Sequence, residues 1–190
     1  MPEFELRFDE RYWSIVPDEA GAPEWFAGLL AANDEEHHQA LGMAASLAME
    51  TRVQSDLSAL LLLAVPEAGA YGALSVLHVA DAPPAPDEAT AVQIAQSIEP
   101  SDWASSVAPF ESEDVTGWRV SQATPVRSTE GDSASAHVVR DITMVWVLDV
   151  GAHLCIARMT PLPTLSAALL LPQIENVLAS ARFTGAGVAR

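Results

Sequence analysis

The side chains that could bind a metal are few and poorly spaced. Glu35 and His38 form a Glu-x-x-His pair, the spacing that places a carboxylate and an imidazole on one helix face in di-iron proteins. Such a site needs a second pair and further carboxylates, and neither Glu111 nor Glu175 is followed by a histidine at this spacing. We therefore expect His37 and His38 to be exposed in a solvated helical turn, and the protein to hold no metal or other cofactor.

The sequence also lacks a recognisable nucleophile with its base. The single cysteine, Cys155, lies between Leu154 and Ile156 in an apolar segment, which is typical of a buried, unreactive thiol. No Gly-x-Ser-x-Gly motif occurs, and the Gly-x-Gly at 185–187 has no helix after it that could bind a dinucleotide. All 9 basic residues are arginines, which excludes lysine chemistry such as Schiff-base formation. The sequence predicts no catalytic residue.

The charge of the chain restricts its partners. The chain has 26 Asp and Glu against 9 basic residues, a net charge of −17 over 190 residues. A field of this sign repels phosphate backbones and anionic lipid headgroups, and the arginines are scattered and form no basic stripe. We expect no binding to nucleic acid or to membranes, and a protein or peptide as the partner.

The N-terminal residues and the apolar runs bear on localisation. Residues 1–10 carry acidic residues where a signal peptide would carry basic ones, and no apolar core follows. The longest apolar run, Ala59 to Val65, is far shorter than the ~20 residues that cross a bilayer. One cysteine fits a reducing compartment. These features predict a soluble, cytoplasmic protein.

Helical patterns dominate the N-terminal third of the chain. Alternation over Phe4 to Phe8 predicts an edge strand, and Pro23 suits the first turn of a helix. Asn33, with Glu36 three residues later, has the spacing of a capping pair that opens a second helix, ending near Gln54.

Strand patterns follow. The apolar run Leu57 to Val65 predicts a central strand covered on both faces, which forms a hairpin with residues 74–79. After a proline-rich linker, Asp87 begins a helix. The segment Val138 to Leu148 is expected to pair antiparallel with Leu154 to Met159.

The remaining segments complete the predicted order of elements. Trp118 and Val120 alternate with polar residues in a further strand, and residues 128–135 form a polar loop. The last helix carries Ile174 and Val177, and Pro172 either kinks it or lies in its first turn. Phe183 is expected to fix the end of this helix.

Hairpin connections favour an antiparallel sheet with helices packed on it, so the predicted fold class is α+β. We expect one domain over residues 1–184, with an N-terminal strand and helices in 1–55, sheet and helices in 56–184, and a flexible tail at 185–190. The layout of the strand at 57–65, the linker and helix from Asp87, the hairpin at 149–151 and the ending at 174–183 resembles the PsbP/Mog1-like fold and a group of uncharacterised actinobacterial proteins. This resemblance implies a binding module and transfers no functional residue.

The tryptophans are the most unusual feature of the composition. Trp25 and Trp146 lie in apolar surroundings and are expected in the core, whereas Trp103 and Trp118 flank acidic sequence and are candidates for a partner-binding surface. We expect a non-catalytic module that binds a protein or peptide, as an adaptor or a chaperone does. Two alternatives stay open, namely a small-ligand-binding domain and an enzyme with an acidic or histidine site between sheet and helices.

Overall fold

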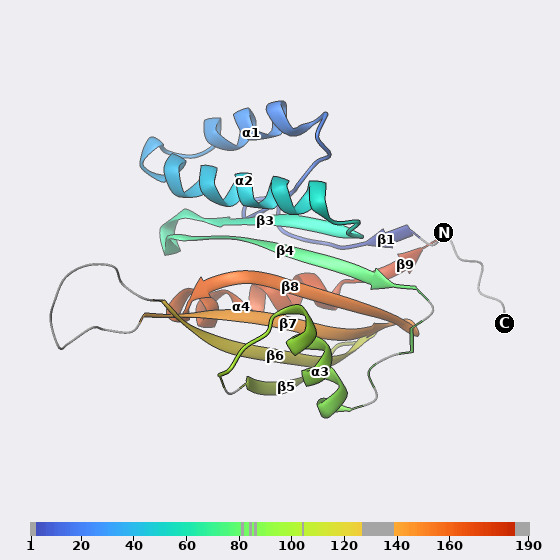
Figure 1. Ribbon diagram of the computed structural model, residues 1–190. Helices are drawn as coiled ribbons and strands as arrows, with labels where there is room; N and C mark the ends of the chain where they lie inside the picture. The colour runs from blue at the N-terminus through green and yellow to red at the C-terminus, as the bar shows by residue number, and fades with distance from the viewer. Residues whose placement is uncertain are drawn as a thin grey trace, which may run out of the picture.

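A seven-stranded sheet organises the fold, and every pair of neighbouring strands in it is antiparallel (Figure 1). The computed structural model describes residues 3–80, 82–83, 85, 87–103, 105–126 and 139–184. In spatial order, the strands are β2 (Trp13–Ile15), β3 (Ala59–Val65), β4 (Ala70–Val79), β8 (His153–Pro163), β7 (Val139–Val150), β6 (Val115–Val126) and β5 (Ser105–Glu111). The predicted α+β class is confirmed.

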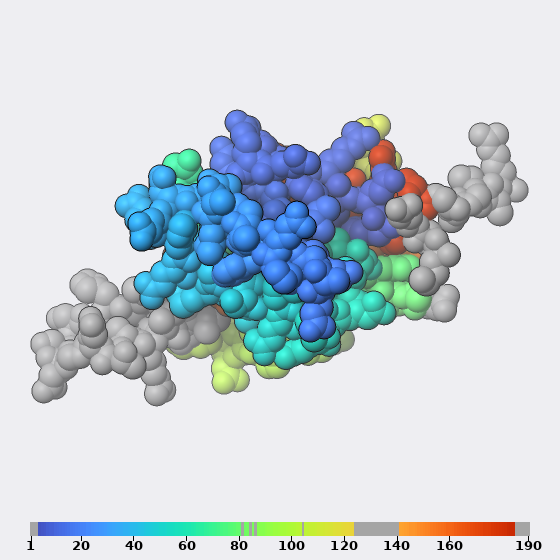
Figure 2. All heavy atoms as spheres, turned by 90° about the horizontal axis from the view of Figure 1, so that it is seen from above, coloured from blue at the N-terminus to red at the C-terminus, as the bar shows by residue number. Residues whose placement is uncertain are grey.

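In the described part of the chain, helices lie over both faces of this sheet. On one face, α1 (Ala22–Ala31) and α2 (His38–Gln54) lie at the β3 and β4 side, and α3 (Glu88–Ile98) lies over β5, β6 and β7. On the opposite face, α4 (Thr164–Ala179) packs against β7 and β8. Seen from above, the blue and cyan N-terminal residues hide much of the sheet (Figure 2).

The apolar run predicted as a central strand is β3, which is buried on both faces. Leu61 and Leu63 point into the core under α4, whereas Leu60 and Leu62 point into the core under α2. The strand itself is confirmed, but its predicted central place is wrong, because β3 is second from the edge and only the short β2 lies outside it. β3 is apolar along its whole length because helices cover both of its faces, and not because it lies in the middle of the sheet.

The β7–β8 hairpin forms as predicted. Asp141 pairs with Pro163 at one end and Val150 with His153 at the other, with an irregularity between Ile142 and Met144. The predicted segment begins at residue 138, which lies outside the described residues, as do the polar loop 128–135, His137 and the tail 185–190.

A separate two-stranded ribbon joins the beginning and the end of the described chain. β1 (Glu3–Glu5) pairs antiparallel with β9 (Arg182–Thr184), so the predicted edge strand at 4–8 is shorter than expected. The Phe4 and Phe183 rings lie 5.2 Å apart, and Arg182 forms a 2.6 Å ion pair with Glu5. Phe183 thus lies in a strand after the last helix.

Pro172 lies inside α4, not in its first turn.

The predicted capping pair at Asn33 is wrong. The Asn33 side chain donates to the Leu29 carbonyl at 2.9 Å and so caps the end of α1, not the beginning of α2. A short 3-10 turn, Glu35–His37, then leads into α2. An asparagine between two helices can serve either end, because it carries both a donor and an acceptor.

Asp87 caps α3, and this cap gives a testable dependence on pH. Its carboxylate accepts from the Thr90 backbone N at 2.8 Å, and this hydrogen bond lowers the pKa of Asp87. A lowered folded-state pKa adds stability above the unfolded-state pKa, and that stability is lost as the pH falls through the folded-state value. We expect Asp87→Ala to lower the Tm by about 2 to 4 °C at pH 7 and by less at pH 3, as followed by circular dichroism. Asp87→Asn keeps an acceptor and serves as the control. A deficit in the alanine variant that does not shrink on acidification would contradict this role.

Candidate functional site

The main packing areas of α2 and α3 leave a strip of the sheet between them. α2 packs mainly on β3 and β4, and α3 packs mainly on β5, β6 and β7, although Leu154 and Ile156 of β8 also belong to the core under α3 (Figure 1). On this face the side chains of Leu77 and Ser75 in β4 lie beside Ile156 and Arg158 of β8. Leu77 is exposed and the others are half-buried. This strip is therefore a surface that combines apolar and polar side chains.

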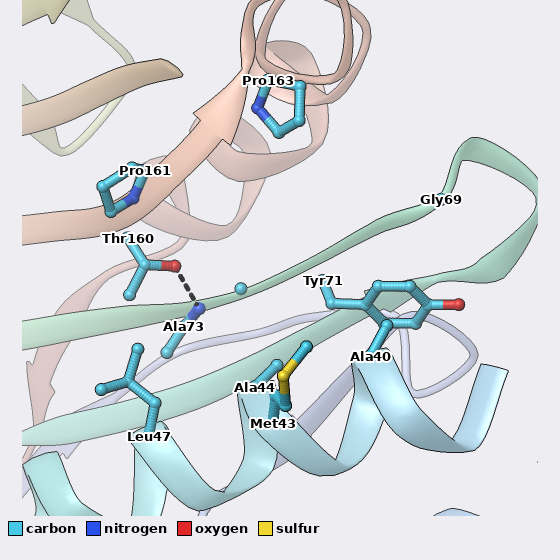
Figure 3. A pocket seen from close by; sticks show the side chains of 11 residues that line it. Ala40, Met43, Ala44, Leu47, Gly69, Tyr71, Ala73, Thr160, Pro161 and Pro163 are labelled. Atoms are coloured by element: carbon cyan, nitrogen blue, oxygen red, sulfur yellow. Dashed lines mark hydrogen bonds between the residues drawn. The ribbon is translucent and has the colours of Figure 1, made fainter. Parts of the chain in front are cut away.

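A cavity of about 310 Å³ lies at one end of this strip, and we call it the α2–β8 groove (Figure 3). Met43 and Leu47, one helical turn apart on α2, extend toward the strands and are 64% and 52% exposed. The remaining lining is small, aromatic or proline, namely Ala40, Ala44, Gly69, Tyr71, Gly72, Ala73, Thr160, Pro161 and Pro163. Large apolar side chains at a concave surface are a feature of binding sites.

The floor of the groove depends on a close approach of β4 to β8. A Cβ atom on Gly72 would lie 2.6 Å from Met159 Cε and 2.7 Å from Thr160 Oγ1, so only glycine fits without a shift of these side chains. The Thr160 hydroxyl accepts from the Ala73 backbone N at 2.9 Å (Figure 3). Because this hydroxyl is already bonded, the floor offers a shaped apolar surface more than a reactive group.

The opposite side of the strip carries an ion pair. Arg158 on β8 donates to Glu99, which follows the last residue of α3, with an N–O distance of 2.6 Å. Both side chains are about one-third exposed, at 34% and 30%. Each neutralises the other, so this pair adds no net charge to the strip.

The groove is negative at its Tyr71 end. Burial raises the pKa of the Tyr71 hydroxyl, and the nearby carboxylates of Glu36 and Glu67 raise it further. Tyr71 is the only titratable residue among those that line the groove. Its hydroxyl is buried without a hydrogen-bond partner in the described part of the chain. This end of the groove therefore favours a cationic group on whatever binds there.

The two tryptophans predicted to bind a partner do not lie together. Trp118 on β6 faces Pro109, whereas Trp103 precedes Ser105, whose partner is Gln122. Trp118 and Gln122 are four residues apart in β6, which corresponds to roughly 13 Å at about 3.3 Å per residue. Trp118 is half-buried against the core under α3, and Trp103 is 47% exposed. Their role in binding stays a prediction.

The core assignment of the other two tryptophans holds for one of them. Trp146 is fully buried under α4. Trp25 is only half-buried, and its indole N–H donates to the Ser14 hydroxyl at 3.3 Å. Trp25 lies on the outermost helix, so the apolar sequence around it does not lead to full burial.

The histidine pair predicted to be exposed is half-buried. His38 Nε2 lies 2.9 Å from the Asn33 carbonyl, and the His37 ring lies 6.3 Å from the Tyr71 ring. The prediction failed because the chain folds back between α1 and α2 and places this turn against β4. Among the described residues, no group of three or more His, Cys, Asp or Glu side chains could hold a metal ion.

The cysteine and two of the histidines lie outside the groove. Cys155 is buried, and burial raises the pKa of its thiol to about 12. His78 and His153 pack with Phe183 in an aromatic cluster, with ring centroids 4.5 to 5.1 Å apart. These packed rings support the β1–β9 ribbon.

Sequence reasoning missed Met43 and Leu47. In the sequence, Leu47 reads as a member of a narrow stripe with Leu41, Ala44, Ala48 and Thr51, whereas the structure buries Leu41, Ala45 and Ala48. The available signal was an apolar surface on α2 wider than that stripe.

Comparisons with models of protein families, with curated proteins and with solved structures found no match to this chain. Within the described residues, the helices are too short or too polar to span a bilayer.

Proposed function

We propose that this protein is a non-catalytic module that binds a segment of another protein in the α2–β8 groove. The observation that supports this most is the pair of exposed side chains, Met43 and Leu47, beside a concave apolar floor. Burial of a leucine or methionine side chain contributes about 1.5 to 3 kcal/mol, so covering these two side chains is a substantial source of affinity. The resemblance of the layout to the PsbP/Mog1-like binding modules agrees with this proposal.

The charge around the groove defines the partner. Glu36 and Glu67 lie near Tyr71 at one end, and the whole chain carries −17. The partner segment is therefore apolar, with arginine or lysine residues at one end. Long-range attraction between opposite charges speeds association, so raising the salt concentration is expected to slow association more than dissociation.

A site-specific crosslink tests the proposal. We expect a photoreactive benzoylphenylalanine at position 47 to form a covalent adduct with a protein partner in cells of the source organism. The same group at position 169 serves as the control, because Leu169 is 62% exposed on α4 on the opposite face. Equal adducts at both positions would show non-specific contact and count against the groove.

The partner found in this way then allows a measurement of affinity. We expect Leu47→Glu to weaken binding at least tenfold, because it places a charge on the apolar wall of the groove. Leu169→Glu makes the same chemical change on the other face and should leave the Kd unchanged. Isothermal titration calorimetry compares the three proteins. An unchanged Kd in the folded Leu47→Glu variant would remove the groove from the interface.

A further inference from the structure

A second surface, at the outer edge of the sheet, has backbone groups without a partner among the described residues. Val16 donates to the Leu60 carbonyl at 3.0 Å and Ala64 donates to the Tyr12 carbonyl at 2.8 Å. In an antiparallel pair, the N–H and C=O of every second residue point toward the partner strand. Those of Ser14 therefore also point toward β3, and those of Ile15 point away from the sheet. Since β2 is the edge strand, the N–H and C=O of Ile15 face outward. Such an edge can pair with another strand.

Cavities flank both faces of this edge strand. The larger, which we call the α1 cavity, measures about 520 Å³ and lies between β2 and α1, with Ser14 and Trp25 in its lining. A second, of about 320 Å³, lies on the β1 side and includes Ile15 in its lining. Ile15 itself is 62% exposed. An added strand would thus find space for side chains on both of its faces.

The α1 helix lies over the α1 cavity without burying any of its own side chains there. It contains Trp25, Phe26, Leu29 and Leu30, yet none of its residues is buried. Figure 1 shows why, because α1 lies outside α2, and Trp25 reaches only the edge strand β2. Gly28 lines the cavity, and a Cβ atom there would meet nothing within 4 Å. An apolar side chain placed in this space would bury the inner side of α1.

The charges at the rim select the occupant. Glu10 lines the α1 cavity and has no ion-pair partner in the described chain, whereas the neighbouring Arg11 is paired with Asp9 at 2.5 Å. A cation on the incoming segment would neutralise Glu10. A second copy of this chain would instead place the small polar Ser14 beside the α1 cavity, and it would add a further charge of −17.

We propose that the β2 edge accepts an extended segment of another protein, which adds a strand to the sheet, places a large apolar side chain in the α1 cavity and carries a basic residue near Glu10. The backbone of the segment pairs with Ile15, and its alternate side chains enter the two cavities. This site is separate from the α2–β8 groove.

Two substitutions block the two halves of this site. Ile15→Pro removes the outward N–H and leaves the hydrogen bonds to β3 intact, because edge strands tolerate a proline whose nitrogen faces solvent. Gly28→Leu fills the α1 cavity and favours the helix, so it should fold even if the proline variant does not. Leu47→Glu is the control, because it alters only the groove.

The probe is a phage-displayed library of random twelve-residue peptides selected on the wild-type protein. We expect the selected peptides to alternate apolar residues next to a lysine or arginine, and to bind Ile15→Pro and Gly28→Leu at least tenfold more weakly than wild type. Binding to Leu47→Glu should be unchanged. In the wild type, the peptide should slow amide hydrogen exchange at Ile15.

Three results would overturn this inference. The first is equal binding of the selected peptides to the wild-type, Ile15→Pro and Gly28→Leu proteins. The second is loss of binding in Leu47→Glu alone, which would assign the peptides to the groove and leave the proposed function standing. The third is a wild-type dimer that Ile15→Pro converts to a monomer in light scattering, which would assign the edge to a second copy.

Discussion

Replacement of Gly117 by alanine is expected to destabilise the fold by about 3 kcal/mol or more, because strain and steric overlap act together. Gly117 lies in β6 between β5 and β7, with φ at +152°, a conformation that residues with a side chain rarely adopt. A Cβ atom there would lie 2.2 Å from the Val147 carbonyl oxygen and 2.9 Å from Leu148 Cα. These are backbone atoms of a paired strand, so they cannot move aside without breaking the ladder.

The same substitution at Gly28 provides a matched control of opposite sign. Gly28 lies inside α1, and a Cβ atom there meets nothing within 4 Å. Alanine in a helix interior is favoured over glycine by up to about 1 kcal/mol. Thermal melts should therefore show a Tm roughly 6 to 12 °C lower for Gly117→Ala and a slightly higher one for Gly28→Ala. A Gly117→Ala protein as stable as wild type would mean that β6 takes a different path.

Truncation of Trp146 is the second change with a large expected effect. Trp146 is fully buried between the sheet and α4, in the core that also contains Ile174 and Leu178. Removal of a buried tryptophan side chain leaves a cavity and costs about 3 to 5 kcal/mol. We expect Trp146→Ala to lower the free energy of unfolding in urea by this amount.

Two further variants separate the effect of the lost aromatic ring from the effects of the indole N–H and of burial. The Trp146 indole N–H is buried without a hydrogen-bond acceptor in the described chain, so Trp146→Phe removes an unpaired donor while keeping an aromatic ring. It should cost clearly less than Trp146→Ala. Trp103→Ala makes the same truncation at a residue that is 47% exposed and should cost less than half as much. Equal losses for Trp103→Ala and Trp146→Ala would contradict the burial described here.

The long elements of this fold could be predicted from the sequence because their patterns are locally complete. The β3–β4 and β7–β8 hairpins carry long apolar segments around short turns, and Asp87 is followed by a helical pattern. In these cases neighbouring residues decide the structure, and period and capping suffice to read it.

The missed features depend on residues far apart in the chain. β5 contains Pro109 and little alternation, and becomes a strand because β6 offers an edge to pair with. β1 is fixed by β9 at the other end of the chain. The candidate groove could not be read either, because the exposure of Met43 depends on how α2 packs on β3 and β4. Tertiary packing, not propensity, decides these elements.

The β1–β9 ribbon also determines how the molecule would respond to mechanical tension. Glu3 pairs with Thr184 at the open end of the ribbon, and Glu5 pairs with Arg182 further in. A force that pulls the two ends of the chain apart would load these pairs one after another, as a zipper opens, and would not shear them together. The rungs would part from Glu3 inward, with the Glu5–Arg182 ion pair last. The seven-stranded sheet would bear no load until the ribbon had opened, so the ribbon would open before any tension reached the core.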